Sequence, residues 1–191
     1  MNMFNFRLLT QALFSLCLFF SLGATAAVVT GNSQGNIIVE EFFDYQCPHC
    51  RIMLESTEKL AKNNSEIKLV TRVVPLLDGN SWTIARAALA ARKQGKYEAL
   101  HHLLMQERQY IAYPRVMQLA KIAGLDMSRL RRDMRSQSIA SELNENIKIS
   151  RERGIDVIPA VFAYRINNRS AEISVVGDKS YADLQNSLAD L

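Results

Sequence analysis

The sequence predicts an α/β fold in which an all-helical segment is inserted between two sheet-forming parts. Residues 37–74 read as strand, helix and strand in that order. Residues 80–153 have few Gly and Pro, and their apolar residues recur every three or four positions, which is a helical period. After Gly154 the pattern of strands returns. A chain of 191 residues with 48% hydrophobic content is long enough to bury one core and a satellite cluster of helices.

The first 26 residues are expected to be separate from this fold. Arg7 precedes a largely apolar run, Leu8–Leu22, and Ala24-Thr25-Ala26 places small residues at a cleavage position, as in a signal peptide. The alternative is a retained anchor, but the run is shorter than the roughly 20 residues that span a bilayer. Lipid attachment at Cys17 would require a small residue where Leu16 stands, so Cys17 is expected to leave with the leader. We therefore predict export, into the periplasm, of a mature chain with two cysteines.

The first sheet-forming part follows a lead-in, residues 27–35, that is small and polar and predicts a short flexible segment. Ile37–Phe43 is rich in β-branched and aromatic residues and predicts a buried strand. A helix is expected to begin at the cysteine pair and to continue through Arg51–Lys62, because Pro48 suits a first turn. Ile67–Val74 predicts a second strand, and the crossover is long enough to make the two strands parallel.

The helical segment is expected to hold four or five helices. Ser81 can cap the first, which would end at Gly95, and Tyr97–Gln109 predicts the second. Further helices are expected around residues 116–123 and 127–134, and a longer one is expected to place Ile139, Leu143 and Ile147 on one stripe before Gly154. The second sheet-forming part then predicts a hairpin, Ala160–Ile166 and Glu172–Val176 around Asn167-Asn168, and a last helix, Tyr181–Leu188. The expected domains are 27–79 with 154–191, and an inserted helical domain over 80–153.

The charge is too mild to favour a nucleic-acid partner. The net charge of +4 falls to +3 once Arg7 is removed with the leader. Within residues 80–153, however, 14 Lys or Arg stand against 7 Asp or Glu. This local excess is typical of solvated helix faces, and a client-binding surface is the alternative.

The chemistry is expected at Cys47-Pro48-His49-Cys50. Two cysteines this close together cannot staple a fold, because the stabilisation from a disulfide rises with the length of the closed loop. The sulfur of Cys47 would lie at the positive end of the helix dipole, which favours a thiolate, and His49 can add to this effect. We therefore expect Cys47 to exchange disulfides with a partner, and the more buried Cys50 to resolve the mixed disulfide.

Other uses of the pair fit the sequence less well. A c-type haem site requires His directly after the second cysteine, where this chain has Arg51. A zinc site would need two further ligands, and beyond His49 only His101 and His102 are available as histidines. The last two are expected to be surface or packing residues whose rings point in different directions. No metal and no organic cofactor is implied; the redox group is the Cys47–Cys50 disulfide itself.

Glu41 is a carboxylate within an apolar strand, and it is either an exposed edge residue or a buried functional group. It shares a face of the strand with Ile37, Val39 and Phe43. Burial would raise its pKa and let it pass protons to Cys50. Glu40, on the opposite face, is expected to meet solvent.

The segment from Glu41 to Cys50, EFFDYQCPHC, resembles the active-site segment of the DsbA family of bacterial periplasmic disulfide oxidases. The likeness extends over the mature chain, since that family has a thioredoxin-like fold interrupted by a helical domain. It implies a cis-proline facing the active site, which Pro159 matches, and Ile158 keeps the β-branching that many members have before it. It also implies an acidic residue at the position of Glu41.

The resemblance implies oxidation of cysteine pairs in unfolded or reduced exported proteins, with a membrane quinone-linked oxidase of the DsbB type restoring the disulfide. A disulfide isomerase or reductase is the rival enzyme, although such periplasmic proteins usually carry a dimerisation segment for which residues 27–36 are too short. A chaperone-like binder of unfolded exported proteins, with a groove around Pro159, is the rival outside the enzyme class.

Overall fold

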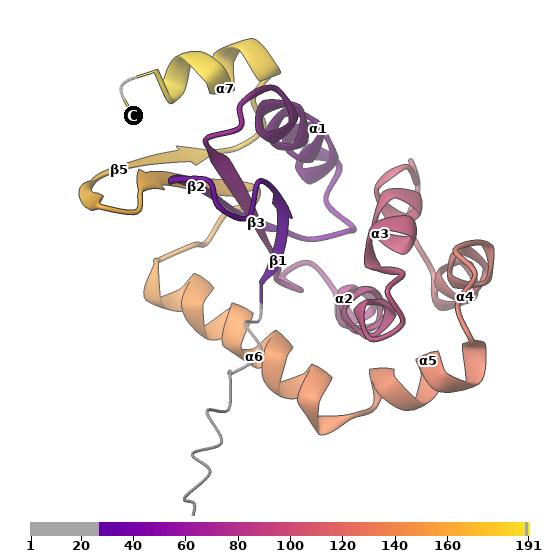
Figure 1. The fold of residues 1–191 in the computed structure, drawn as a ribbon. Coiled ribbons are helices and arrows are strands. Elements are labelled where there is room, and N and C mark those ends of the chain that lie inside the picture. Colours follow the sequence, from indigo (N-terminus) through magenta and orange to yellow (C-terminus); the bar gives the residue numbers. More distant parts are fainter. Residues whose placement is uncertain (1–26, 190) are drawn as a thin grey trace, which may run out of the picture.

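A computed structural model of the chain describes residues 27–189 and 191. The predicted signal peptide, residues 1–26 with Cys17, lies outside the described residues. Five strands of the described part form one sheet, and seven helices surround it (Figure 1). In chain order the elements are β1 (Val28–Gly31), β2 (Ile37–Phe43), α1 (Pro48–Asn63), β3 (Ile67–Val73), α2 (Gly79–Arg92), α3 (Tyr97–Met105), α4 (Tyr113–Ile122), α5 (Met127–Met134), α6 (Gln137–Glu152), β4 (Ala160–Arg165), β5 (Asn168–Val176) and α7 (Tyr181–Ser187).

The sheet has the order β1-β3-β2-β4-β5, with β2 in the centre. β2 and β3 are parallel, as the crossover predicts, and Glu41 pairs in register with Thr71. β4 and β5 form the predicted hairpin, and β4 runs antiparallel to β2. Every residue of β2 is buried, because strands or helices cover it on all sides.

The expectation that residues 27–35 are a flexible lead-in is wrong. Val28–Gly31 forms β1, which pairs antiparallel with β3 at the edge of the sheet. Two valines and a threonine give this stretch the β-branched side chains that suit a strand, and the short length hid the pattern. The following turn passes so close to β3 that a Cβ on Gly35 would lie 2.5 Å from the carbonyl oxygen of Glu66.

The helices lie in two groups. α1 and α7 cover one face of the sheet, and α6 crosses the other face, while α2 to α5 gather beside the sheet (Figure 1). The five helices α2 to α6 all fall between β3 and β4, so the predicted α/β sheet with inserted helices is confirmed. The largest buried cluster joins these inserted helices to Phe43, Tyr45 and Cys50 at the end of β2 and the start of α1. The division into two domains at residues 80 and 153 stays a prediction.

The first inserted helix begins earlier than expected. Asp78, and not Ser81, is the N-cap of α2, because its carboxylate accepts the backbone N–H groups of Asn80 and Ser81. Ser81 lies buried inside the first turn. The next helix, α3, ends at Met105 instead of at Gln109.

Glu40 does not meet solvent, which corrects the expectation from strand alternation. The residue is 4% exposed, and its carboxylate accepts hydrogen bonds from Arg72 of β3 at 2.5 Å and from Arg153, next to α6, at 2.8 Å. α6 lies over this face of the sheet, so the polar side of β2 is covered as well as the apolar side. Two arginines compensate for the burial of one carboxylate, and this ion pair ties the inserted helices to the sheet.

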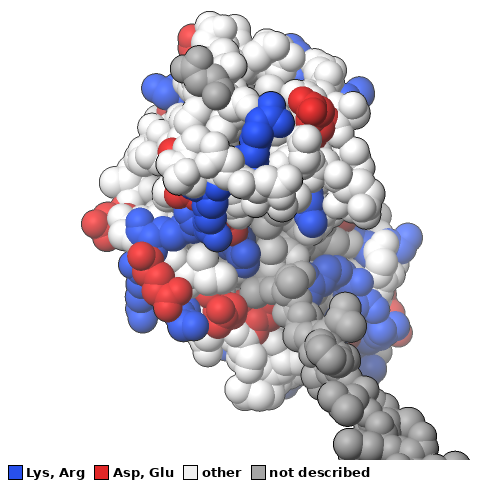
Figure 2. Space-filling model, turned by 60° about the vertical axis from the view of Figure 1, so that its left-hand side comes forward, with Lys and Arg blue, Asp and Glu red and all other residues white. Residues whose placement is uncertain are grey.

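The face of the molecule shown in Figure 2 carries mixed charge. In the left-hand part of the face shown in Figure 2, Lys and Arg side chains lie side by side with Asp and Glu side chains. Among residues 27–189 and 191, no helix combines the length and the apolar character that crossing a bilayer requires.

Candidate active site

The turn between β2 and α1 carries the two cysteines. Asp44, at its start, is 1% exposed, and its carboxylate accepts backbone N–H groups of Gln46 at 2.9 Å, Leu76 at 3.0 Å and Leu77 at 3.2 Å. This carboxylate therefore fixes the turn and joins it to the segment that leads into α2. Pro48 occupies the first turn of α1, as predicted, and Cys47 is the N-cap of the helix.

Cys47 is surrounded by donors that favour its thiolate. The structure holds both cysteines as free thiols, and the backbone N–H of Cys50 points at Cys47 Sγ from 3.3 Å. A hydrogen bond from the Cys50 thiol lowers the pKa of Cys47 to about 6, against the effect of partial burial and with help from backbone N–H groups and from His49. The thiolate is thus favoured by the helix start, as the sequence predicts, but the partner thiol contributes more than His49.

Cys50 differs from Cys47 in both exposure and pKa. Its side chain is fully buried, whereas that of Cys47 retains 5% exposure. Burial and the hydrogen bond to Cys47 raise the pKa of the Cys50 thiol far above its ordinary value, and the nearby Glu41 adds to the rise. The two sulfurs are therefore unequal in access and in acidity.

Glu41 is buried without exposed surface, and burial raises its pKa from 4.5 to about 8. Its Oε2 atom lies 2.6 Å from the hydroxyl of Thr57, which also lies 3.0 Å from the carbonyl oxygen of Leu54. Because a hydroxyl has one hydrogen, Thr57 can satisfy Leu54 only if the carboxyl group of Glu41 is the donor in the other contact. Oε1 of Glu41 has no hydrogen-bond partner among the described residues. Both observations fit a carboxyl group that is neutral at pH 7.

His49 turns toward a residue that the sequence did not single out. Its Nδ1 atom lies 2.9 Å from Oδ1 of Asp178, in the loop between β5 and α7. Gly177 has a left-handed φ of +79°, and its N–H donates to the carbonyl oxygen of Pro159, which holds this loop beside the active site. A Gly-Asp pair after a strand indicates only a turn, so no local pattern points to this contact.

Pro159 begins the segment that faces the cysteines. Its peptide bond with Ile158 is cis, as predicted from the resemblance. The carbonyl oxygen of Ile158 lies 3.8 Å from Cys47 Sγ, with the thiol as donor. The active-site turn therefore contacts two distant parts of the chain, Ile158 beside Cys47 and Asp178 beside His49.

Beneath the turn, Tyr45 is fully buried and its hydroxyl lies 2.8 Å from Nδ1 of His101. Burial lowers the pKa of His101, so the neutral ring accepts the hydrogen of the tyrosine. His101 is a packing residue, stacked on Tyr97 with ring centroids 5.1 Å apart, while the side chain of His102 is exposed. Within the described residues, no group of three His, Cys, Asp or Glu side chains could hold a metal ion.

Cys47 has a lowered pKa and slight exposure at the start of a helix, Cys50 is fully buried one turn further on, and a cis-proline lies beside them. On this sheet, these features define a thiol-disulfide oxidoreductase with a thioredoxin-like fold. The chain belongs to the family of DSBA-like thioredoxin domains, whose sequence profile matches residues 38–189.

Solved structures agree with this assignment. A thioredoxin-like oxidoreductase from Silicibacter pomeroyi DSS-3 is 33% identical, with a TM-score of 0.78 over 86% of this chain and 91% of that one. The thiol-disulfide exchange protein alpha-DsbA2 from Wolbachia pipientis is 22% identical, with a TM-score of 0.74 over 85% of each chain. A periplasmic thioredoxin-like protein from Salmonella enterica serovar Typhimurium is 20% identical, with a TM-score of 0.73 over 88% of this chain and 91% of that one. At these lower identities, the similarity to the Wolbachia and Salmonella proteins shows a shared fold only.

Longer proteins contain a similar segment. The Na(+)/H(+) antiporter NhaA 3 of Salinispora tropica is 24% identical over 136 residues, which are 70% of this chain and 21% of that protein. The antiporter NhaA 1 of Salinispora arenicola is 26% identical over 62% of this chain and 19% of that protein. The chain thus spans about a fifth of the length of these curated relatives.

Proposed function

We propose that this protein oxidises cysteine pairs in exported proteins by donating its Cys47–Cys50 disulfide. The observation that carries the proposal is the inequality of the two sulfurs: the pKa of Cys47 is lowered to about 6, while that of Cys50 is raised. A site that stabilises the Cys47 thiolate stabilises the reduced protein, and a stable reduced form makes the disulfide a strong oxidant. DsbA itself is the established example of such an oxidant, so this direction is shared with the family.

In the first step, a client thiolate attacks Cys47 Sγ, the more accessible sulfur. The bond between the two sulfurs breaks, and Cys50 leaves with the electron pair. The neutral carboxyl group of Glu41 supplies the proton that Cys50 takes up, because the pKa of Cys50 lies above that of Glu41. Glu41 is then restored by a proton from solvent after the client has left.

In the second step, another thiolate of the client attacks the client sulfur of the mixed disulfide. The mixed bond breaks, and Cys47 leaves as a thiolate that the helix start and His49 stabilise. The client loses two electrons and gains a disulfide, while the protein gains two electrons and becomes a dithiol. A membrane quinone-linked oxidase of the DsbB type would restore the disulfide. The segment at Ile158 and Pro159 would hold the client backbone beside Cys47.

The compartment is part of the proposal. Residues 1–26 are proposed as a cleaved signal peptide, and the similar protein from Salmonella enterica is described as periplasmic. Fractionation of cells that make the full chain, with mass measurement of the mature N-terminus, tests this point. A mature chain beginning at Ala27 in the periplasmic fraction is the expected result.

The reduction potential of the Cys47–Cys50 disulfide tests the function, with equilibration against glutathione as the measurement. A potential above that of the compartment is expected for a donor, and one far below it would assign the protein as a reductase. A Cys47→Ser variant that still prevents aggregation of unfolded proteins would favour the chaperone-like alternative.

A further inference from the structure

A pocket lies among the inserted helices, apart from the cysteines. It has a volume of about 360 Å³ and is formed by side chains of α2, α4 and α5 together with Arg135, which follows α5. The lining residues are Thr83, Arg86, Tyr113, Arg131, Met134 and Arg135. We call it the arginine pocket, because three of its six lining residues are arginines and none is acidic.

Within the part of the chain that the structure describes, Arg86, Arg131 and Arg135 lack acidic partners, in contrast to Arg92 and Arg115 of the same group of helices. Arg92 pairs with Glu142, and Arg115 pairs with Glu107 at 2.7 Å. Among the described residues, no carboxylate forms an ion pair with Arg86, Arg131 or Arg135. The Nε atom of Arg86 is moreover buried without a hydrogen-bond partner, an arrangement that costs free energy. An anion in the pocket would offset this concentration of like charge.

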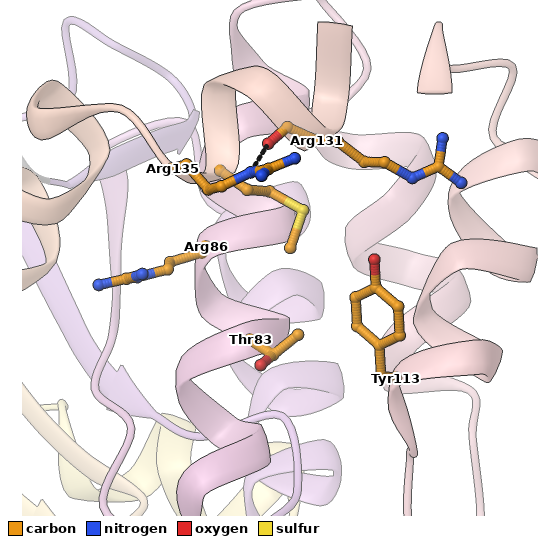
Figure 3. Close-up of a pocket in the computed structure, with 6 residues that line it drawn as sticks. Thr83, Arg86, Tyr113, Arg131 and Arg135 are labelled. Atoms are coloured by element: carbon orange, nitrogen blue, oxygen red, sulfur yellow. Dashed lines mark hydrogen bonds between the residues drawn. The ribbon is translucent and has the colours of Figure 1, made fainter. Parts of the chain in front are cut away.

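The close-up in Figure 3 shows how the lining residues are arranged. Arg131 and Arg135 lie at the upper end of the view, Arg131 extends over Tyr113, and the hydroxyl of Tyr113 points toward this end, while the side chain of Arg86 points from α2 away from Tyr113. Nε of Arg135 donates to the carbonyl oxygen of Arg131 at 3.0 Å, which fixes its side chain and leaves its terminal N–H groups for a ligand. Tyr113 is 46% exposed. Arg131, Arg135 and Tyr113 therefore supply the polar groups at this end of the pocket.

Hydrogen bonds connect the active-site turn to the segments that lead into the helices lining the pocket. Gln46, next to Cys47, exchanges two hydrogen bonds with Ile111, at 3.0 Å and 3.3 Å, and the side chain of Asn80 donates to the same carbonyl group. Tyr113 follows Ile111 by two residues, and Thr83 follows Asn80 by three. From Asn80 to Arg86 the helix rises by about 9 Å, the span of about three residues of extended chain. A polypeptide bound at Cys47 would have to pass the Gln46–Asn80 contact and then this length of α2 to reach the pocket.

We propose that the arginine pocket binds an acidic side chain of the client, a few residues away from the client cysteine that reacts with Cys47. The proposal rests on the proposed exchange with protein clients and adds a rule for choosing among them. A polypeptide suits the pocket better than a small ion does, because Tyr113 and Met134 offer apolar contact beside the guanidinium groups. The carboxylate of Asp or Glu matches the fork of an arginine.

The test uses pairs of synthetic peptides with two cysteines that differ by one residue, Glu or Gln, placed at increasing distances on either side of the cysteines. The rate constant for oxidation of each peptide by the oxidised protein is measured at low salt. At one range of distances the Glu peptide should react about three- to tenfold faster than its Gln partner, the scale of one or two exposed ion pairs.

Variants then locate the effect. In a double variant, Arg131→Gln with Arg135→Gln, the preference for Glu should disappear while the rate with the Gln peptide stays unchanged, which also shows that the fold is intact. Arg132→Gln is the matched control, because it removes the same charge from the same helix but does not line the pocket. This control should keep the preference.

Equal rates for Glu and Gln peptides at every distance would overturn the proposal. An equal loss of preference in the Arg132→Gln variant would also overturn it, since the attraction would then be general to α5. If the oxidised protein oxidises none of the peptides, the proposed direction of the reaction is wrong, and the same comparison is made with reduced protein and oxidised peptides. The preference for Glu is measured in either direction, so the two failures are distinct.

Discussion

Nδ1 of His49 lies 2.9 Å from a carboxylate oxygen of Asp178, although 129 positions separate the two residues. The contact lets the loop after the last strand act on the residue between the two cysteines. It holds the imidazole ring by one nitrogen and adds a negative charge near the sulfur that must carry negative charge itself. Asp178 therefore positions the imidazole ring, and we expect its negative charge to disfavour the Cys47 thiolate.

Replacing Asp178 with Asn should lower the pKa of Cys47 further below about 6, because the opposing negative charge is lost and the ring of His49 is released. The expected change is about half a unit, as for one charge at moderate distance near a surface. Ultraviolet absorbance of the thiolate against pH measures it. Glu145→Gln removes an exposed carboxylate from α6 and serves as the control. A rise in the pKa would mean that Asp178 helps the thiolate through His49.

Glu41→Gln should change the pH dependence of stability. The pKa of Glu41 is raised in the folded protein, from 4.5 to about 8. Its contribution to stability is therefore complete below about pH 4.5 and is lost as the pH rises toward 8. Between about pH 5 and pH 7 the reduced wild-type protein should lose roughly 3 kcal/mol that the variant keeps. Urea denaturation at both pH values measures this, with the exposed Glu55→Gln as control. Parallel losses in wild type and Glu41→Gln would contradict it.

Cys50→Ser should accumulate mixed disulfides with clients, because the buried sulfur that resolves them is gone. Cys47→Ser should form none, since the remaining sulfur is buried and its pKa is raised. Non-reducing gels of cells that make each variant, with mass identification of the adducts, measure the difference. Similar adduct levels in the two variants would reverse the assignment of roles.

The reduced protein should melt at a higher temperature than the oxidised protein at neutral pH, by a few degrees. The pKa of Cys47 is lowered in the folded state, from 9.0 to about 6. This contribution to stability is complete above the unfolded value, shrinks as the pH falls toward 6 and is gone below it. Calorimetry of both forms across this range measures the gap, which should close in acid. A higher melting temperature for the oxidised form at every pH would rule out a stabilised thiolate.

Glu40→Gln should destabilise the fold by about 3 to 5 kcal/mol, because Arg72 would be left with a buried charge and no compensating carboxylate, and Arg153 would keep only Glu172. The free energy of unfolding in urea is the measurement. Glu172→Gln, which removes the outer and more exposed partner of Arg153, should cost clearly less. Equal losses of unfolding free energy in the two variants would mean that the buried ion pairs of Glu40 stabilise the fold no more than the exposed pair does.

The sequence was most informative where one local pattern decides the structure. Strand and helix periods located β2, α1, β3 and the inserted helices, and the position of Cys47 at a helix start predicted its thiolate. The apolar neighbours of Glu41 on one strand face left its burial open, and the family resemblance favoured a buried functional group. Each of these inferences needs only residues within a few positions of each other.

The errors and omissions lie where the answer depends on distant segments. Alternation along β2 assigns Glu40 to solvent, but α6 covers that face and supplies Arg153. Asp178 meets His49 only through the loop between β5 and α7, and Asp44 meets Leu76 and Leu77 only once β3 is in place. β1 forms because an edge of β3 is free to pair with four residues. A single sequence carries no local sign of such contacts.

The contacts of Cys47 with Ile158 and of His49 with Asp178 span 111 and 129 residues. Because a ribosome makes the chain from its N-terminus, the two cysteines are synthesised long before the segments that complete their surroundings. During that interval the pair has neither the carbonyl group of Ile158 nor the carboxylate of Asp178 beside it. The redox centre is thus among the last features of the molecule to mature, and its reactivity is a property of the finished chain.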